Sequence, residues 1–371
     1  MSFSLSLRIL NNKLLMYGFI KVAAAVPSVR VADCKFNTTQ IEGMMARAEG
    51  LGVEIIVFPE LSITGYTCQD LFQQQILLEE AETSLLKIME FSHNLNITTI
   101  VGLPLAYDGM LLNCAAIIQG GKIYGIVPKT YIPNYKEFYE ARWFSSASRL
   151  GRQEQINFFG QQIPCGDHLL FNNGRFTFGV EICEDLWATI PPSSKLSLHG
   201  AEIIFNLSSS NELVGKNAYL KGLISNQSAR CISGYVYAGS GYGESTQDIV
   251  FSGLGFIAEN GHILEEGKRF SMQEQLIVSE IDIDSLRQER RVNTTFASVK
   301  DLMQQSDKGT YFQIEMNPTI LDKERFTLTR NIPSHPFVPS ADKIDECCEE
   351  ILSIQSEGLA KRIDHTHAET V

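Results

Sequence analysis

The chain has 371 residues, of which 44% are hydrophobic and 20% charged, and its formal net charge is −12. This acidic balance argues against a binding surface for nucleic acid or for anionic membranes, because both require concentrated positive charge. The apolar fraction is ordinary for a globular protein, and the length suffices for a large core or for two average domains.

Cysteine usage indicates a reducing compartment. The eight cysteines form no C-x-x-C pair and match no zinc spacing, and the seven histidines are scattered, so we expect neither a disulfide framework nor a metal site. The N-terminus lacks an unbroken apolar segment typical of a signal peptide. No apolar run approaches the ~20 residues of a membrane span. The sequence therefore predicts a cytoplasmic protein without membrane association.

Apolar runs and turn residues predict the regular elements in chain order. Strands are predicted at residues 18–26, 54–58, 98–103, 113–119, 122–127, 176–182, 203–207, 235–239, 253–258, 262–265 and 276–281. Helices are predicted at about 37–50, 70–96, 193–199 and 216–233. This mixture of hairpins and strand–helix units predicts an α/β fold in which helices cover sheets, instead of a purely parallel doubly wound sheet.

The composition of the sequence changes near residue 285. Residues 285–340 are polar and proline-rich, which predicts an extended connecting arm. Residues 341–364 then show a helical pattern of apolar residues. A single helix after a long arm is interpreted as the opening of a further domain.

Three short segments follow predicted strands and carry side chains suited to chemistry. They contain Glu60 after the strand 54–58, Lys129 after 122–127, and Cys183 after 176–182. Functional groups of α/β layer structures gather at strand ends. A thiolate can attack a carbonyl carbon, a carboxylate can accept and return the proton, and an ammonium can stabilise the oxyanion. Together these groups predict an acyl-transfer site that releases ammonia or an amine.

The neighbours of Cys183 bear on its reactivity. Glu181, Glu184 and Asp185 lie beside it in the sequence, and we expect their negative charge to raise the thiol pKa. A reactive Cys183 therefore needs a cation close by, and Lys129 can supply one.

The wider strings make the pattern specific. They are PELSITGY at 59–66, KTYIPNYKEFYEARWF at 129–144 and EICEDLW at 181–187. From about residue 16 to residue 283 the chain resembles the nitrilase (carbon-nitrogen hydrolase) superfamily, and within it the glutaminase domain of glutamine-dependent NAD synthetases. The resemblance implies an α-β-β-α sandwich. It also implies that glutamine is hydrolysed through a thioester and that the ammonia serves the ATP-dependent amidation of deamido-NAD.

The resemblance assigns roles by position. It makes Glu60 the general base, Lys129 the oxyanion-stabilising lysine and Cys183 the nucleophile. Glu137 matches the second glutamate of the superfamily, although the sequence leaves open whether Glu137 or Glu140 faces the site.

The substrate pocket is assigned in the same way. Tyr135, Ser210 and Lys216 match positions that hold glutamine, Lys216 being suited to its α-carboxylate. Tyr66 is a further candidate for the pocket wall, and the backbone N–H of Glu184 is a candidate for the oxyanion site.

The expected domain organisation follows from the same comparison. Residues 1–15 are interpreted as an N-terminal extension or alternative start, 16–284 as the glutaminase domain, 285–340 as the connecting arm and 341–371 as the first helix of a synthetase domain. The S-G-G-x-D-S loop of that domain does not occur. The chain is therefore expected to be a fragment of a longer protein or a free-standing subunit, and the fragment is favoured because the arm and the final helix have no evident role alone.

The partners and cofactors expected by resemblance are few. They are L-glutamine, a synthetase domain of the same chain or of a partner subunit, and a further copy of this chain in a homo-oligomer. No cofactor is expected for glutamine hydrolysis, and ATP and Mg are expected only for the synthetase domain. Two rival interpretations remain: a free-standing amidase or carbamoyl hydrolase of the same fold, and a non-catalytic assembly domain.

Overall fold

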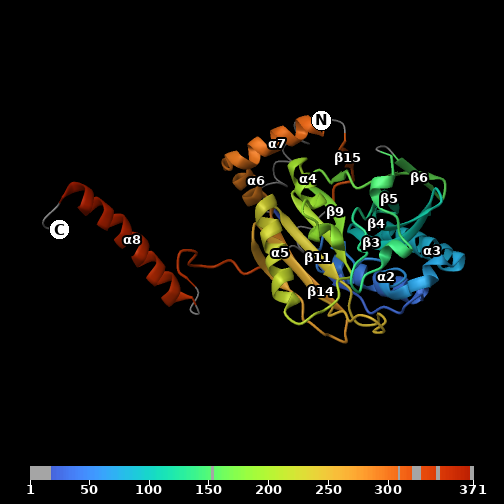
Figure 1. Ribbon diagram of the computed structural model, residues 1–371. Coiled ribbons are helices and arrows are strands. Elements are labelled where there is room, and N and C mark those ends of the chain that lie inside the picture. Colours follow the sequence, from blue (N-terminus) through green and yellow to red (C-terminus); the bar gives the residue numbers. More distant parts are fainter. Residues whose placement is uncertain (1–17, 152–153, 308–309, 320–326, 340–342, 368–371) are drawn as a thin grey trace. The chain divides into compact units, whose positions relative to one another are not determined.

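The computed structural model describes residues 18–151, 154–307, 310–319, 327–339 and 343–367 (Figure 1). The chain divides into two compact units, Met1–Thr329 and Arg330–Val371. The residues expected to form the N-terminal extension, 1–15, lie outside the described residues. None of the helices in the described part has the length and apolar character needed to cross a membrane.

The described part of the first unit contains two sheets. The eight-stranded sheet has the order β14-β1-β2-β3-β4-β5-β7-β6. Its strands are β1 (Phe19–Val26), β2 (Ile55–Val57), β3 (Thr98–Tyr107), β4 (Met110–Gln119), β5 (Lys122–Pro128), β6 (Glu154–Phe158), β7 (Gln161–Cys165) and β14 (Gln275–Asp282). The seven-stranded sheet has the order β13-β12-β11-β10-β9-β8-β15. Its strands are β8 (Leu169–Asn172), β9 (Thr177–Ile182), β10 (Ile203–Ser208), β11 (Gly234–Gly239), β12 (Gly255–Glu259), β13 (His262–Glu266) and β15 (Phe312–Glu315).

The two sheets pack face to face, and this explains the continuous apolar runs. Along β1, Val22 and Ala24 point into the core between the sheets, together with residues of β9, β10 and β11. Ala23 and Ala25 point to the opposite face, where they meet helical side chains. Strands buried on both faces need apolar residues at every position instead of at every second one.

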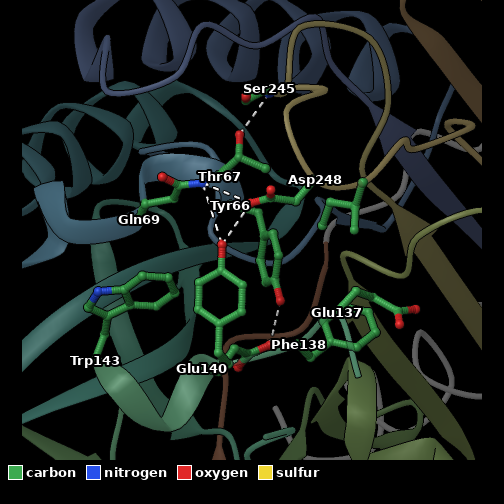
Figure 2. Close-up of a pocket in the computed structure, with 11 residues that line it drawn as sticks. Tyr66, Thr67, Gln69, Glu137, Phe138, Glu140, Trp143, Ser245 and Asp248 are labelled. Carbon is green, nitrogen blue, oxygen red and sulfur yellow. Dashed lines mark hydrogen bonds between the residues drawn. The ribbon is translucent and has the colours of Figure 1, made fainter. Parts of the chain in front are cut away.

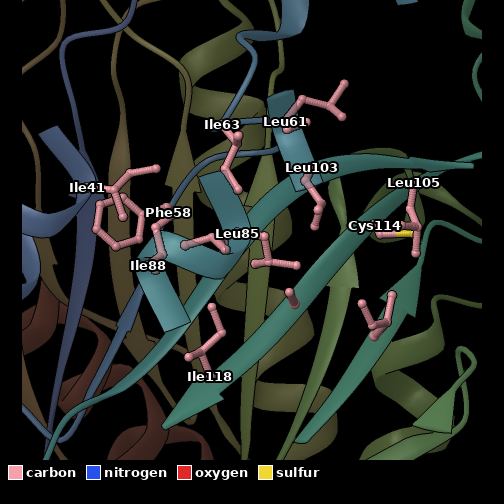
Figure 3. Close-up of a cluster of buried hydrophobic side chains, with 14 of the residues drawn as sticks. Ile41, Phe58, Leu61, Ile63, Leu85, Ile88, Leu103, Leu105, Cys114 and Ile118 are labelled. Carbon is pink, nitrogen blue, oxygen red and sulfur yellow. The ribbon is translucent and has the colours of Figure 1, made fainter. Parts of the chain in front are cut away.

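Helices cover both outer faces. The α-helices of this unit are α2 (Cys34–Gly50), α3 (Gln75–Phe91), α4 (Pro192–Leu198), α5 (Lys216–Cys231), α6 (Ile283–Val292) and α7 (Thr294–Ser306). Figure 3 shows Ile41 of α2 and Leu85 of α3 packed with Phe58, which follows β2, and with Leu103 of β3. Leu196 of α4 and residues of α5 form a separate cluster with the outer face of the second sheet. The α-β-β-α sandwich expected from the sequence is confirmed.

The strand directions bring two predicted segments to the same edge. β2 and β3 are parallel, β4 is antiparallel to β3, and β5 is antiparallel to β4. The carboxyl ends of β2 and β5 therefore meet at one edge of the first sheet, where Glu60 and Lys129 follow them. In the second sheet β9 and β10 are parallel, and Cys183 follows the end of β9.

The structure corrects the interpretation of residues 285–340 as an extended arm. This part of the chain instead contains α6, α7 and β15, and β15 pairs with β8 in the second sheet. Asp282 and Asn293 cap the two helices, accepting hydrogen bonds from backbone N–H groups three residues on. The polar side chains that suggested an arm are used in docking, since Arg287 pairs with the Glu202 carboxylate. Residues 327–339 contain no helix or strand.

The second unit contains α8 (Ile344–Thr366), near the expected helix at 341–364. None of its described residues is buried. The prediction that it opens a further domain stays a prediction.

Gly102 in β3 is predicted to be necessary for the approach of the Glu60 turn. A Cβ at this position would overlap the Leu61 backbone nitrogen and lie 2.7 Å from the Pro59 carbonyl oxygen. Gly102→Ala is expected to lower the free energy of unfolding by about 1–3 kcal/mol through overpacking. In α2, Gly43→Ala meets no atom within 4 Å and is expected to stabilise the protein by about 0.5–1 kcal/mol. Urea unfolding measures both, and equal effects would contradict the prediction.

Candidate functional site

Three predicted side chains meet between the edges of the two sheets, and all of them are buried. The exposed fractions are 1% for Glu60, 0% for Lys129 and 5% for Cys183. Lys129 Nζ lies 2.5 Å from Glu60 Oε1, and the Asn113 side chain donates a 2.7 Å hydrogen bond to the same oxygen. The other oxygen, Glu60 Oε2, is buried and has no hydrogen-bond partner among the described residues. Glu60 therefore keeps one oxygen available for a proton.

A second glutamate completes the surroundings of Lys129. Both carboxylate oxygens of Glu140 lie 2.9 Å from Lys129 Nζ, and Glu140 is itself buried. Burial alone would lower the pKa of Lys129, but Glu140 and Glu60 outweigh it, and the net pKa is raised. The lysine is therefore held as an ammonium ion between two carboxylates.

The structure places Glu140, and not Glu137, against Lys129. The loop after β5 reverses at Lys136, whose φ is +51°, and the Glu140 backbone N–H donates to the Pro133 carbonyl at 3.1 Å. This return directs Glu140 inward. Glu137 instead accepts a 2.7 Å hydrogen bond from Asn211. Of the two glutamates that the sequence left open, Glu140 is therefore the one that holds the lysine.

Cys183 sits on a strained turn between β9 and a short 3-10 helix (Cys183–Trp187). Its φ is +47°, an uncommon value for a residue other than glycine. Its backbone N–H donates to Asn206 Oδ1 at 3.2 Å. Such strain is found at sites where the chain must present one side chain in a fixed direction.

The electrostatics of the thiol differ from the sequence expectation. Burial, Glu60 and Glu140 raise the pKa of Cys183, and Lys129 opposes them. The sequence neighbours Glu181, Glu184 and Asp185, which were expected to raise the thiol pKa, are not among the groups that shift it. Glu181 accepts from the Tyr235 hydroxyl and from the Ser193 backbone, and Asp185 accepts from backbone N–H groups. Lys129 is the nearby cation that the sequence predicted.

A cavity of about 250 Å³ opens beside Cys183. Most residues predicted to bind substrate line it, namely Tyr135, Ser210, Lys216 and Glu184, together with Glu137. Its size is compatible with a small polar molecule.

The Lys216 ammonium is held in place at the wall of this cavity by neighbouring side chains. Lys216 Nζ donates to Asn211 Oδ1 at 2.7 Å and lies 5.2 Å from the centre of the Trp187 ring. Burial lowers the pKa of Lys216, with nearby acidic groups opposing. Across the cavity wall, the Tyr135 hydroxyl donates to Glu184 at 2.8 Å.

Tyr66 lies elsewhere. Its hydroxyl donates to Glu140 at 2.7 Å, and it lines a smaller pocket of about 30 Å³ (Figure 2). The Tyr139 hydroxyl, which also lines this pocket, donates to Asp248 at 2.8 Å and accepts from the Gln69 side chain at 3.5 Å. Tyr66 therefore supports the Lys129 cluster through Glu140 and does not line the cavity beside Cys183.

Sequence reasoning missed Asn113 and Asn206. Asn113 lies on β4 and Asn206 on β10, and both make buried hydrogen bonds to the groups described above. An asparagine inside an otherwise apolar strand is the signal that could have marked them. Among the described residues no group of three or more His, Cys, Asp or Glu side chains is arranged to hold a metal ion.

Comparison with known proteins gives a family match. The model of the carbon-nitrogen hydrolase family matches residues 21–291. The glutamine-dependent NAD(+) synthetase of Mycobacterium tuberculosis (strain ATCC 25618 / H37Rv) is 33% identical over 352 residues, which are 94% of this chain and 51% of that protein. The Thermotoga maritima protein of the same name is 29% identical over 71% of this chain and 42% of its own length. The chain thus spans about half the length of the curated relatives it matches most fully.

Solved structures agree on the fold. The crystal structure of a glutamine-dependent NAD(+) synthetase from Cytophaga hutchinsonii superposes with a TM-score of 0.65 at 29% identity, covering 71% of this chain and 43% of that one. A carbon-nitrogen hydrolase from Helicobacter pylori G27 superposes with a TM-score of 0.60 at 18% identity, covering 77% and 98%. At that identity the second likeness concerns the fold alone.

The carboxylate cluster predicts how stability depends on Lys129. Burial raises the pKa of Glu140 to about 7, and Lys129 opposes this rise. In Lys129→Met that ammonium is lost, and a buried charge is left uncompensated. The variant is expected to lose about 3–5 kcal/mol at about pH 8. Because the folded pKa of Glu140 then lies further above its unfolded value of about 4.3, the folded state binds the proton more tightly, and the lost stability returns as the pH falls toward that value.

Urea unfolding at about pH 8 and about pH 5.5 measures this effect. Lys221→Met, which removes a lysine from a half-exposed pair with Glu266, is the control and is expected to cost about 0–1 kcal/mol at both pH values. A loss in Lys129→Met that does not shrink on acidification would contradict the charge interpretation.

Proposed function

The chain belongs to the carbon-nitrogen hydrolase family, and from this premise we propose that it hydrolyses the side-chain amide of glutamine. The observation that carries the proposal is the buried Glu60–Lys129–Glu140 cluster beside Cys183, at the end of a cavity that contains Lys216. The names of the relatives support glutamine as the substrate and the synthesis of NAD as the use of the ammonia.

The proposed reaction has two halves. In the first, Glu60 Oε2 accepts the Cys183 proton while sulfur attacks the amide carbon, and Lys129 stabilises the oxyanion. The C–N bond then breaks, Glu60 returns the proton to the leaving nitrogen, and ammonia departs from a thioester. In the second half, Glu60 accepts a proton from water as the water oxygen attacks the thioester carbon. The C–S bond then breaks, Glu60 returns the proton to the sulfur, and glutamate leaves.

The cavity gives a reason for preferring glutamine over a simple amide. Free glutamine carries an α-carboxylate, and the Lys216 ammonium, held by Asn211, lines the same cavity as Cys183. A charge-assisted hydrogen bond between them would orient the amide toward the thiol. An aliphatic amide lacks that group. This observation favours the glutaminase over the rival amidase or carbamoyl hydrolase.

The remaining parts of the proposal concern partners. We propose that amide hydrolysis uses no cofactor and that ATP and Mg serve a synthetase domain to which ammonia passes. The curated relatives are about twice as long as the matched region, which leaves room for such a domain in them. Association of this chain into a homo-oligomer and its cytoplasmic location stay predictions.

The nucleophile is tested by Cys183→Ala. Ammonia release from glutamine is expected to fall to background because the thioester cannot form. Cys231→Ala, a change to an equally buried cysteine in α5, is expected to retain turnover. An electrophilic glutamine analogue should label Cys183 in the wild type, and glutamine should slow the labelling. Turnover retained in Cys183→Ala would refute the assignment, and absence of labelling in the wild type would favour the assembly-domain rival.

The substrate is tested by Lys216→Ala. Loss of a charge-assisted hydrogen bond costs about 1.5–3 kcal/mol, so KM for glutamine is expected to rise roughly 10- to 150-fold. Hydrolysis of a simple aliphatic amide should not change. Lys221→Ala, on the same helix but paired with Glu266, should leave KM unchanged. An unchanged KM for glutamine in Lys216→Ala would exclude the proposed contact.

A further inference from the structure

Asp185 lies two residues after Cys183 and accepts hydrogen bonds from two separate segments of backbone. Its Oδ2 accepts from the Ile182 N–H at 2.9 Å, within the turn that carries the nucleophile. Its Oδ1 accepts from the N–H groups of Tyr131 at 2.8 Å and Thr130 at 3.2 Å, in the loop directly after Lys129. One carboxylate therefore connects the chain around Cys183 with the chain after Lys129.

This carboxylate is fully inside the protein. Asp185 is 1% exposed, and both of its oxygens are engaged with backbone donors. A buried carboxylate is costly unless hydrogen bonds compensate for its lost hydration. The N–H groups of Ile182, Thr130 and Tyr131 supply these hydrogen bonds, so the contacts that stabilise the carboxylate also hold the two segments together.

The connection crosses from one sheet to the other. Lys129 follows β5 of the first sheet, where its N–H donates to the Asn113 carbonyl and its carbonyl accepts from Ala147. Cys183 follows β9 of the second sheet, where Asn206 of β10 accepts its N–H. These bonds fix each residue relative to its own sheet. The bonds to Asp185 fix the two segments relative to each other.

We propose that Asp185 is a positioning residue that sets the spacing between the Cys183 thiol and the Lys129 ammonium. It acts through backbone geometry and not through its own charge, since the charged groups that act on the thiol are Glu60, Lys129 and Glu140. In terms of turnover the inference rests on the proposed glutaminase function. Displacement of reacting groups by about 1 Å can cost roughly a hundredfold in rate.

The test compares Asp185→Asn with a matched control. The asparagine keeps the size but replaces one acceptor oxygen with an NH2 group that cannot accept a backbone N–H. The control is Asp167→Asn. Asp167 accepts from the Thr130 side chain at 3.1 Å, so it contacts the same loop, but its other side-chain partner is His168 and not the Cys183 turn.

For glutamine hydrolysis, Asp185→Asn is expected to lower kcat by roughly tenfold to a hundredfold while KM changes by less than about twofold. Asp167→Asn is expected to retain both constants. Asp185→Glu keeps the negative charge but lengthens the side chain by a methylene group, and it is expected to be slow as well. Full activity in Asp185→Glu combined with loss in Asp185→Asn would instead assign the effect to charge and overturn the proposal.

A second measurement does not depend on the substrate. Alkylation of Cys183 by iodoacetamide, followed across pH, reports how closely the ammonium lies to the thiol. Asp185→Asn is expected to shift this profile to higher pH and to slow alkylation near neutrality, and Asp167→Asn is not. If the wild type alkylates but does not hydrolyse glutamine, the proposed function fails while the positioning role is still decided by this profile.

Three results would overturn the positioning role of Asp185. They are an unchanged alkylation profile in Asp185→Asn, equal losses in Asp185→Asn and Asp167→Asn, or a loss that lies wholly in KM. Circular dichroism and urea unfolding check that the compared variants are folded. If both Asp185 variants fail to fold, the carboxylate is required for the fold and the positioning role is rejected.

Discussion

The ammonium of Lys129 is the group on which the arrangement of the site depends. It is fully buried, 2.5 Å from one Glu60 oxygen and 2.9 Å from both Glu140 oxygens. A buried ammonium without partners would lose its proton, so two carboxylates from different segments must reach it. The close approach at Gly102 lets the Glu60 turn come in, and the return of the loop to Pro133 brings Glu140. The backbone geometry at these two places thus brings both carboxylates to the Lys129 ammonium.

The two-sheet frame explains why this charge lies beside a cysteine. Glu60 and Lys129 leave the first sheet, whereas Cys183 leaves the second, so their spacing depends on how the sheets pack. That packing is apolar, with alternate residues of β1 and β9 meeting in one core. Apolar contacts hold the sheets together but specify position less sharply than directional bonds do. Polar links across the edge, such as those of Asp185 and of Ser209 to the Glu60 carbonyl, supply that direction.

Different parts of the structure were predictable for different physical reasons. Strands buried on both faces leave continuous apolar runs, so the sandwich and the strand ends bearing Glu60, Lys129 and Cys183 could be predicted. The helices α6 and α7 were not predicted, because only Ile283 and Leu286 of α6 and no residue of α7 are buried, which is too few apolar positions to show a helical period, and caps and ion pairs supply the rest of the docking. Nor could the sequence decide between Glu137 and Glu140. They are three residues apart in an irregular loop, where direction depends on one positive φ at Lys136.

The same charges constrain how the proposed nucleophile is activated. Burial, Glu60 and Glu140 raise the pKa of Cys183, and Lys129, which lowers it, already has two carboxylate partners. A thiolate formed before attack would add a third negative charge around a single ammonium. In the proposed reaction the proton therefore leaves as the sulfur attacks, with Glu60 Oε2 as its acceptor. Such a concerted step tolerates little change in the distance between the two sheets. The hydrogen bonds of Asp185 to the backbone on both sides of the junction limit that change.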